Sequence, residues 1–412
     1  MNSIVRLLYP IFAITLIIFL FTAIAPIAPA QTETLLYQFT GAPDGATPYA
    51  GPALKGTTLY GTTMEGGTGP GDTGYGIAYA ISTTTGKETI LHTFTANTQA
   101  PYDGVEPLGG VAVYNGNLYG TTLGGGLYDG EGYGTIYEIA KSGKKYVETV
   151  IYAFSGGLDG AYPYYVTPVF DKVGNLYGTT AYGGYYGNGA VFKLSPGGQL
   201  TTLHSFYQAG GDGYTPDAGV ALDAKGNVYG TAPGGGAYGY GVLYEITAAG
   251  QYSILYNFTG GTDGGTPRNA LVYKGGKLYG TTQSGGAGCT WGCGVIFEYT
   301  LAKGKAAGKE TVLYTFNGTD GLYPLYGPLV FDAQGNIYGT TSDGGPTNLG
   351  NVYKLAPDGT LTTLYNFDQQ PDGYAPMGGV ALDARGIVYT TGAYGGNYGG
   401  EYGAGTVIKI TP

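Results

Sequence analysis

The stretch Asn175-Leu176-Tyr177-Gly178-Thr179-Thr180 decides the fold, because the chain repeats it along its whole length. Its tyrosine occurs seven times, at spacings of 59, 58, 52, 50, 59 and 51 residues. The repeated tyrosines are Tyr60, Tyr119, Tyr177, Tyr229, Tyr279, Tyr338 and Tyr389. Gly-Thr follows the tyrosine in six copies, and the seventh copy reads Tyr389-Thr390-Thr391. A period of 50 to 59 residues predicts a repeat architecture.

Each repeat contains four short runs with the composition of β-strands, separated by glycine-rich turns. Residues 219–223, 176–180, 189–194 and 202–206 are examples of the first, second, third and fourth run. The fourth run ends in phenylalanine in every copy, at Phe39, Phe94, Phe154, Phe206, Phe258, Phe316 and Phe367. Four strands per repeat of this length are typical of a β-propeller blade. The sequence therefore predicts an all-β fold, a seven-bladed β-propeller with four-stranded blades.

The two ends of the repeat region are complementary. Residues 35–39 form a fourth-type run with no repeat before it, and residues 407–410 form a third-type run with no fourth run after it. Pairing these two runs would satisfy two exposed strand edges at once. We therefore expect the N-terminal strand to complete the last blade and close the ring.

Residues 1–30 have the pattern of a signal peptide, with Arg6, an apolar run over 7–25 and Ala28-Pro29-Ala30 at the end. The apolar run is long for a signal core, so an uncleaved membrane anchor is the alternative. We expect residues 31–412 to form the propeller domain. We expect the protein to be secreted, extracellular or at the cell surface, and a periplasmic location is the alternative. Membrane contact would require the N-terminal segment to stay uncleaved.

The composition indicates a folded and acidic chain. Only 11% of the residues are charged. The 81 glycines and 22 prolines recur at regular intervals along the chain, and the 43 tyrosines provide aromatic rings for a core. Low-complexity disorder lacks such a period. The net charge is −10, and an acidic exported protein is a poor candidate for binding nucleic acid.

Two repeated features have structural explanations. A glycine inside a strand often marks a close approach, so we expect a tyrosine of the neighbouring blade to cover the repeated glycine. Asp-Gly-x-x-Pro suits a turn in which the aspartate accepts backbone hydrogen bonds. The alternative is a ring of seven aspartates near the axis that holds a cation. The aspartates are Asp44, Asp103, Asp159, Asp212, Asp263, Asp320 and Asp372.

The repeat resembles that of the choice-of-anchor, GloVer-type family of exported bacterial proteins. The matching residues are Gly-Asn-Leu-Tyr-Gly-Thr-Thr (174–180), Gly-Gly (183–184), Ala-Val-Phe-Lys-Leu (190–194) and Phe-Ser-Gly-Gly-Leu-Asp-Gly (154–160). The resemblance covers residues 31–412. It implies export and often surface attachment through a C-terminal sorting signal, which this sequence does not show. The family offers no catalytic residues to carry over.

Few catalytic or metal-binding roles are expected for the cysteines, the tryptophan and the histidines. In an exported protein, Cys289 and Cys293 are expected to form a disulfide that pins one glycine-rich loop. Trp291 between them is either a contact residue or a lid on its own loop. His92 and His204 replace a tyrosine of the fourth run, and no cysteine cluster or second histidine accompanies them. Zinc or histidine-based nucleophilic chemistry is therefore not expected.

The charges predict two different faces. The loops joining second to third strands and the connections between blades should emerge on one face, which we call the loop face. By this assignment the loop face carries 16 acidic residues and a single basic one, Arg268, whereas the opposite turns carry 13 of the 17 basic residues that follow residue 30. Acids and tyrosines gather in the loops of repeats 7, 1 and 2, which ring closure would make consecutive.

Tyrosine rings beside carboxylates suit sugar binding, and carboxylate oxygens also suit calcium. Asp129 and Glu131 are the candidate calcium ligands. The candidate ligand-binding residues are Glu65, Asp72, Tyr75, Glu106, Tyr128, Asp129, Glu131, Tyr133, Tyr398, Glu401, Tyr402 and Trp291.

The sequence favours an exported binding module, acting as a monomer, with a glycan or another surface polymer as its partner. One alternative is a carbohydrate-active hydrolase or lyase that uses Asp129 and Glu131 as an acid–base pair. Another is a structural or adhesive surface protein. The plain alternative for the acids is that they only keep a weakly charged protein soluble. No residue is assigned a catalytic role.

Overall fold

The computed structural model describes residues 32–68, 74–95, 103–126, 132–289, 292–304, 307–368, 371–398 and 403–412. Within these ranges the chain forms 34 β-strands and no α-helix. The described part of the chain accordingly has no helix with the length and hydropathy of a membrane span. Residues Gln31–Pro412 constitute one compact unit, and the description below concerns this unit.

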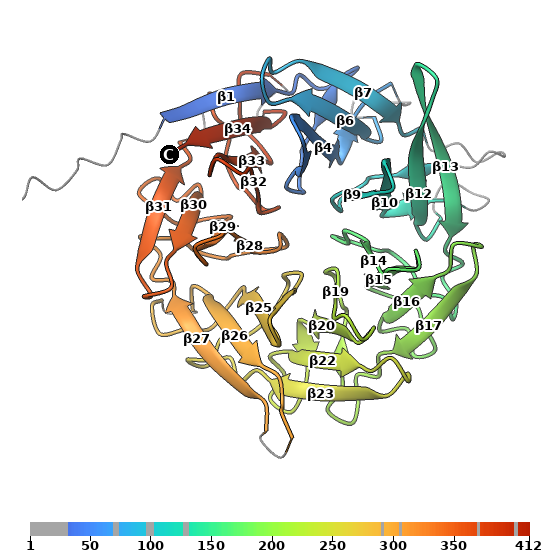
Figure 1. Ribbon diagram of the computed structural model, residues 1–412, viewed down its shortest axis with the longest axis vertical. Coiled ribbons are helices and arrows are strands. Elements are labelled where there is room, and N and C mark those ends of the chain that lie inside the picture. Colours follow the sequence, from blue (N-terminus) through green and yellow to red (C-terminus); the bar gives the residue numbers. More distant parts are fainter. Residues whose placement is uncertain are drawn as a thin grey trace, which may run out of the picture. The chain divides into compact units, whose positions relative to one another are not determined.

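Seven four-stranded antiparallel sheets are arranged in a ring, so the predicted seven-bladed propeller is confirmed (Figure 1). From the innermost to the outermost strand, blade 1 contains β3 (Ala53–Lys55), β4 (Thr58–Thr63), β6 (Ile77–Ser82) and β7 (Glu88–Thr93). Blade 2 contains β9 (Ala112–Tyr114), β10 (Asn117–Thr122), β12 (Thr135–Ser142) and β13 (Lys145–Ala153). Blade 3 contains β14 (Val169–Phe170), β15 (Leu176–Thr180), β16 (Ala190–Leu194) and β17 (Leu200–Ser205).

The remaining blades follow the same order. Blade 4 contains β19 (Ala221–Leu222), β20 (Val228–Ala232), β22 (Val242–Ile246) and β23 (Tyr252–Asn257). Blade 5 contains β24 (Val272–Lys274), β25 (Lys277–Thr282), β26 (Val295–Thr300) and β27 (Lys309–Thr315). Blade 6 contains β28 (Val330–Phe331), β29 (Ile337–Thr341), β30 (Asn351–Leu355) and β31 (Leu361–Asn366). Blade 7 contains β32 (Val380–Leu382), β33 (Val388–Gly392), β34 (Thr406–Thr411) and, from the other end of the chain, β1 (Thr32–Gln38).

Strand β1 closes the ring as the sequence predicted. It pairs antiparallel with β34, from Thr32 opposite Thr411 to Gln38 opposite Thr406. Figure 1 shows β1 on the perimeter of blade 7, outside β34. Because both strands would otherwise expose an unpaired edge, this pairing removes two sites of non-specific association at once.

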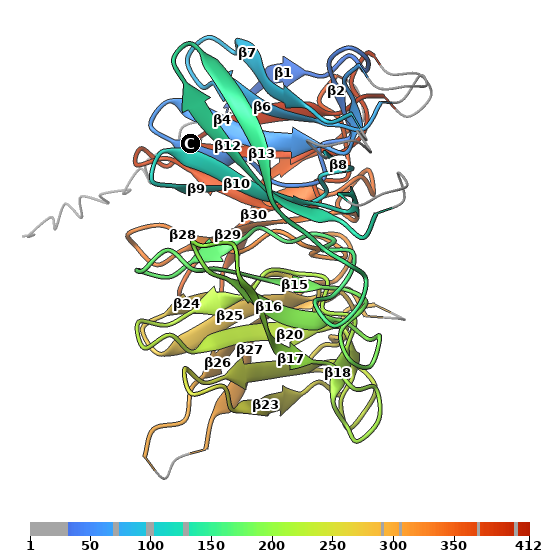
Figure 2. The same cartoon turned by 90° about the vertical axis from the view of Figure 1, so that its right-hand side faces the viewer.

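Three two-stranded ribbons define the loop face. Each joins the connection that enters a blade to the loop between the second and third strands of the same blade. They are β2 (Gly45–Ala46) with β5 (Glu65–Gly66), β8 (Gly104–Val105) with β11 (Gly124–Gly125), and β18 (Gly213–Tyr214) with β21 (Gly234–Gly235). Figure 2 shows β2, β8 and β18 on the same side of the blades.

The repeated glycine is covered from within its own blade, so the expected tyrosine of a neighbouring blade is wrong. In blade 1, Gly61 lies opposite Tyr79 of the third strand, and a side chain on Gly61 would collide with the ring of Tyr79. Tyrosine or phenylalanine occupies this cross-strand position in all six blades that keep the glycine. In blade 7 the glycine is replaced by Thr390, and Ile408 stands opposite it. An aromatic ring lying across a strand thus requires glycine beneath it.

The two threonines of the repeat have different tasks. The first reaches the connection of the next blade: Thr62 donates to the carbonyl of Gly109 at 2.9 Å, and Thr179 donates to that of Ala218 at 2.7 Å. The second closes the start of its own loop, as where Thr63 donates to the carbonyl of Glu65 at 2.8 Å. Buried hydroxyl groups therefore join adjacent blades by donating to backbone carbonyls of the next blade.

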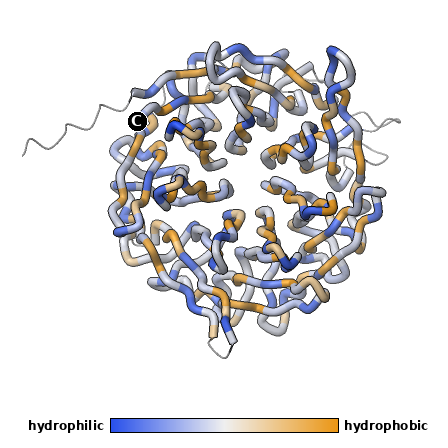
Figure 3. The backbone as a smooth tube through the Cα atoms, in the orientation of Figure 1, coloured by the Kyte–Doolittle hydropathy of each residue, from blue (hydrophilic) through white to orange (hydrophobic). Residues whose placement is uncertain are grey.

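The core between blades is built from phenylalanine. The phenylalanine that follows each outermost strand is fully buried in all seven blades. In six of the interfaces its ring packs on the third-strand aromatic residue of the next blade, with centroids 5.1–5.3 Å apart. Burial of such a ring stabilises the fold by roughly 1.5–3 kcal/mol. Hydrophobic segments accordingly recur in every blade, coloured orange in Figure 3.

The repeated aspartates lie on the perimeter, so the alternative of an axial cation ring is wrong. Each accepts a hydrogen bond from the tyrosine or histidine of its outermost strand. In six of the turns it also accepts a backbone N–H, as from Thr40 to Asp44 at 3.0 Å. The aspartate therefore organises a turn between blades.

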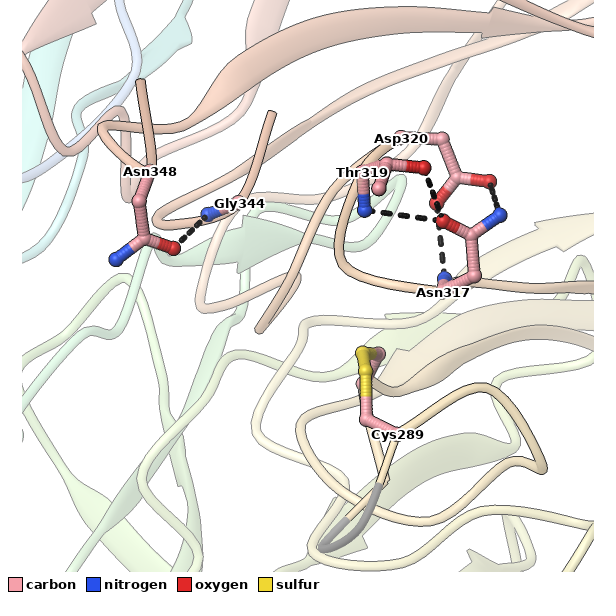
Figure 4. The surroundings of a disulfide bond; sticks show 7 residues. Cys289, Asn317, Thr319, Asp320, Gly344 and Asn348 are labelled. Carbon is pink, nitrogen blue, oxygen red and sulfur yellow. Dashed lines mark hydrogen bonds between the residues drawn. A yellow bond between two sulfur atoms is a disulfide. The ribbon is translucent and has the colours of Figure 1, made fainter. Parts of the chain in front are cut away.

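A disulfide joins Cys289 and Cys293, whose Cα atoms are 5.5 Å apart. It lies in the loop between β25 and β26, beside the aspartate turn of the same blade (Figure 4). A side chain on Gly318 would lie 3.5 Å from the sulfur of Cys289. The bond therefore packs against the turn that Asn317 and Asp320 form, where the amide of Asn317 donates to Asp320 at 2.9 Å.

Candidate functional site

Only some of the ligand-binding residues predicted from the sequence lie within the described residues. Seven of the predicted residues lie outside the described residues: Asp72, Tyr128, Asp129, Glu131, Trp291, Glu401 and Tyr402. This set includes both candidate calcium ligands. Tyr398 is described and is 55% exposed.

The structure brings Glu65 and Glu106 together across the interface of blades 1 and 2. Glu65 lies in β5 and accepts a hydrogen bond from the hydroxyl of Thr47 at 3.4 Å. Burial, and then the nearby charge of Glu65, raises the pKa of Glu106. The backbone N–H of Glu106 donates to the carbonyl of Tyr75 at 3.0 Å, so Tyr75 belongs to the same corner.

Glu106 occupies a strained position that recurs in every blade. The residue before the repeated proline has a positive φ of 53–60° in all seven copies, although none of them is glycine. Glu106 has a φ of 55°. Its N–H bonds to blade 1, and its carbonyl accepts from Leu123 of blade 2 at 3.0 Å. The left-handed conformation lets one residue bond to two blades, and this double bonding offsets strain of about 1–3 kcal/mol.

A larger feature of the loop face is a continuous path of aromatic rings, which we call the tyrosine tract. It runs from blade 2 to the centre of the ring and on to blade 7, with neighbouring ring centroids 3.4–6.4 Å apart. All nine rings are at least partly exposed to solvent. From blade 2 the path runs through Tyr133, Tyr162, Tyr182, Tyr164 and Tyr165; Tyr165 contacts both Tyr326 and Tyr49, and from Tyr49 the path continues to Tyr394 and Tyr374.

The centre of the tract surrounds a small cavity. The cavity has a volume of about 150 Å³, and its lining comes from the connections into blades 1, 2, 3, 6 and 7. Tyr49, Tyr165 and Tyr326 line it. The rings of Tyr165 and Tyr326 stack at 3.4 Å, and the hydroxyls of Tyr49 and Tyr394 hydrogen-bond to each other although 345 residues separate them. Ring closure by β1 is what brings these two residues together.

Charged and polar side chains lie beside this cavity and break the sevenfold symmetry. We call Asp217, Arg268 and Asn269 the axial cluster. Asp217 and Arg268 occupy the position that follows the repeated proline, where the other copies have Tyr49, Leu108, Tyr164, Leu325 and Met377. They form an ion pair, and the Nε of Arg268 also donates to Gln283 at 3.0 Å. The amide of Asn269 donates to the carbonyl of Gly327, which lines the cavity.

The axial cluster contains acceptors without donors. Asp217 and Asn269 are each only 3% exposed. Among the described residues, neither Oδ1 of Asp217 nor Oδ1 of Asn269 has a hydrogen-bond partner. Burial raises the pKa of Asp217 to about 7, although the charge of Arg268 acts in the opposite direction. Unsatisfied buried acceptors are rare and indicate a site where a ligand or water supplies the donors.

Of the residues predicted from the sequence, Glu65, Tyr75, Glu106 and Tyr133 lie at this candidate site, whereas most of the tract and two members of the axial cluster were not predicted. Arg268 was noted only as the single basic residue of the loop face. A usable signal was the residue after each repeated proline, because a position that differs between copies of a symmetric fold is free of the packing that fixes the others.

A family model described as the Gloeobacter/Verrucomicrobia repeat matches residues 22–232, 68–290 and 165–408. The chain belongs to the Gloeobacter/Verrucomicrobia repeat family. This membership agrees with the resemblance seen in the repeat motif. No protein of curated function matches the sequence significantly.

Solved structures share the fold of this family member. A streptogramin B lyase is 12% identical, with a TM-score of 0.55 over 92% of this chain and 97% of that one. A virginiamycin B lyase from Staphylococcus aureus is 13% identical, with a TM-score of 0.56 over 93% of this chain and 99% of that one. At such low identity the similarity establishes the propeller architecture alone.

Proposed function

We propose that this protein is an exported binding module that holds a glycan chain on its loop face. In this proposal, sugar rings stack along the tyrosine tract and the axial cluster bonds to hydroxyl groups of the sugar at the centre of the tract. The observation that carries the proposal is the continuity of the tract: nine partly exposed rings lead to buried acceptors that lack donors.

The chemistry of the two parts fits a polyhydroxylated polymer. Aromatic rings bind the apolar faces of sugars, and the tyrosine hydroxyls add hydrogen bonds at the ring edges. The oxygens of Asp217 and Asn269 accept hydrogen bonds, which sugar hydroxyl groups donate. The axial cavity is smaller than the roughly 300–1,000 Å³ of a whole-ligand pocket, so it suits a single sugar unit or a chain end rather than a complete ligand.

The electrostatics narrow the class of glycan. Glu65 and Glu106 lie beside the inner part of the tract, and the charges of Glu106 and Asp217 contribute to a raised pKa of Tyr164 after its burial and its neighbouring tyrosines. A surface with this sign favours neutral or cationic sugars. An anionic polysaccharide would require calcium ions between its charges and these carboxylates.

A glycan array tests the proposal. The protein is applied with calcium and, separately, with a chelator, and we expect enrichment on neutral or amino-sugar polymers under both conditions. Enrichment on anionic glycans only with calcium would support the bridged form. No enrichment on any glycan would contradict the proposal and favour a structural or adhesive role.

A second candidate, a carbohydrate-active lyase or hydrolase, is supported by one observation. Burial and the charge of Glu65 raise the pKa of Glu106, which is the direction of shift that acid catalysis by a carboxyl group requires. Release of reducing ends or unsaturated products from an array-positive polymer would favour this reading. Glu106→Gln should then abolish product formation while leaving binding intact, whereas a binding module forms no product with either protein.

A further inference from the structure

A second group of ligand-type side chains lies on the perimeter, away from the loop-face site. His92 lies on β7 of blade 1, Asp103 is the repeated aspartate before blade 2, and Glu148 lies on β13 of blade 2. The Nε2 atom of His92 is 3.2 Å and 3.3 Å from the two carboxylate oxygens of Asp103. One ligand atom of each of the three residues lies within 4.8 Å of those of the other two.

The equivalent place between blades 7 and 1 shows what is different here. There the hydroxyl of Tyr37 donates to both Asp44, at 3.0 Å, and Glu88, at 3.1 Å. One tyrosine therefore serves both carboxylates. A neutral imidazole also has one donor hydrogen, but its other nitrogen is an acceptor that can bind a metal ion.

Between blades 1 and 2, His92 replaces this tyrosine and bonds to Asp103 alone, with no hydrogen bond to Glu148. Among the described residues, Oε1 of Glu148 and Oε1 of Glu88 are both buried without a hydrogen-bond partner, but Glu88 accepts from Tyr37 through its other oxygen. The ion pairs of the described residues bring no lysine or arginine to Asp103 or Glu148. Two carboxylates and one imidazole thus share a partly buried place where, among the described residues, no lysine or arginine pairs with them.

We propose that His92, Asp103 and Glu148 bind a divalent metal ion of the zinc class. One imidazole nitrogen with two carboxylate oxygens is a set that zinc accepts, at distances of about 2.0–2.2 Å. Reaching those distances requires small side-chain rotations that replace the bond between His92 and Asp103. The side chain of His92 is 22% exposed, so the ion can enter from solvent and keep water in its remaining position.

Backbone groups hold the central ligand in place. Asp103 accepts the N–H of Thr95 at 2.9 Å and the N–H of Gly104 at 2.8 Å. Bonds of this kind orient a carboxylate and leave its other lone pairs for the ion. The bound ion would join β7 to β13 and so connect blades 1 and 2 at the perimeter.

The second histidine of the chain provides a matched control. His204 also bonds to its aspartate, with Nε2 3.0 Å from Asp212. At that interface Tyr252 takes the third position, stacks on His204 at 3.6 Å and donates its hydroxyl to Asp212 at 2.5 Å. No buried polar atom of that trio lacks a partner among the described residues, so His204 should not take part in metal binding.

Titration calorimetry of the full chain, after treatment with a chelator, tests the proposal with zinc, manganese and calcium. We expect one zinc ion per chain. His92→Tyr installs the residue that five other blades carry and should weaken zinc binding at least 100-fold while preserving the fold. Glu148→Gln should weaken it at least tenfold, and His204→Tyr should change it less than twofold.

Three results would overturn the proposed metal site. If the wild-type protein binds no zinc, or if His92→Tyr retains wild-type affinity, the site is wrong. Equal loss in His92→Tyr and His204→Tyr would also overturn it, because that result would make the histidines structural. Should His92→Tyr fail to fold, the comparison of Glu148→Gln with Glu88→Gln, the same change at the tyrosine-containing interface, decides the question: only Glu148→Gln should lower affinity.

Discussion

The ion pair of the axial cluster should cost stability, and replacing it should stabilise the protein. The change is the double substitution Asp217→Leu with Arg268→Met. Leucine and methionine already occupy this position in other copies of the repeat, so both fit the local backbone. Exchanging a buried ion pair for apolar residues of similar size is often neutral or stabilising by about 1–4 kcal/mol.

The pKa of Asp217 gives an independent magnitude for the stability lost by burying its charge. Burial raises the pKa of Asp217 from 3.8 to about 7. A carboxyl group whose pKa is raised on folding binds its proton more tightly in the folded state, so stability is highest at low pH and falls as the pH rises from 3.8 to 7. At about 1.36 kcal/mol per pH unit, the loss at neutral pH is about 4 kcal/mol. The double variant should recover about 1–4 kcal/mol of it.

Thermal unfolding at pH 7 and pH 4 measures this effect. For a domain of this size, with an unfolding entropy of about 2.1 cal/mol/K per residue, a gain of 1–4 kcal/mol raises Tm by about 1–5 °C. The gain should be present at pH 7 and nearly absent at pH 4, where Asp217 is protonated in the folded protein. Arg268→Met alone should lower Tm at pH 7, because Asp217 is then buried without its partner. At pH 4, where Asp217 is protonated, the Tm of this variant should return to that of the wild type.

A double variant that is less stable than the wild type at pH 7 would refute this reasoning. So would an equal gain at both pH values, because the gain would then arise from apolar packing rather than from the buried charge. Either result would mean that the ion pair has a structural role. The ion pair would then no longer support the proposal that the axial cluster binds a ligand.

Three further predictions concern the rest of the ring. Burial, and then the charge of Asp44, raises the pKa of Glu88 from 4.5 to about 7, so stability should fall as pH rises through this window. Glu88→Gln should flatten that part of a plot of Tm against pH, and an unchanged slope would contradict the assignment. The hydroxyl of Tyr137 is buried without a partner; Tyr137→Phe should therefore leave the urea midpoint unchanged or raise stability by up to ~1 kcal/mol, and a clear loss would reveal a hidden bond. Replacing Cys289 and Cys293 by serine should lower stability by at most about 2 kcal/mol, because the closed loop is short, and a larger loss would mean that the loop supports blade 5.

The sequence predicted the ring because its period is written in residues that the blade itself requires. The repeated Gly-Thr is part of every second strand except the last, and the phenylalanines form every interface between blades. Closure was predictable because a fourth-type strand at the start has its complement at the end. The aspartate turns were predictable because Asp-Gly-x-x-Pro has local turn chemistry.

Other features depend on three-dimensional contacts that the pattern does not encode. The cover of the repeated glycine was assigned to the wrong blade, because cross-strand register between Gly61 and Tyr79 cannot be read from composition. The residues with positive φ before the repeated proline include Tyr162 and Glu106, which carry no glycine-like signal.

The candidate site shows the same limit. With 43 tyrosines in the chain, the few that form the tract stand out only when ring positions are known. Asp217 and Arg268 are 51 residues apart and meet because they occupy the same position in adjacent blades. Their pairing could have been inferred by aligning the repeats, but the buried acceptors beside it could not.

The most direct test of the proposed binding function compares two tyrosines on neighbouring loops. Tyr182 is a central member of the tract, 46% exposed, and Tyr238 in the corresponding loop of blade 4 is 61% exposed and outside the tract. Calorimetry with a glycan identified on the array should show that Tyr182→Ala weakens binding about tenfold, equivalent to about 1.4 kcal/mol, whereas Tyr238→Ala leaves it unchanged. Full affinity in Tyr182→Ala, or an equal loss in both variants, would contradict binding along the tract.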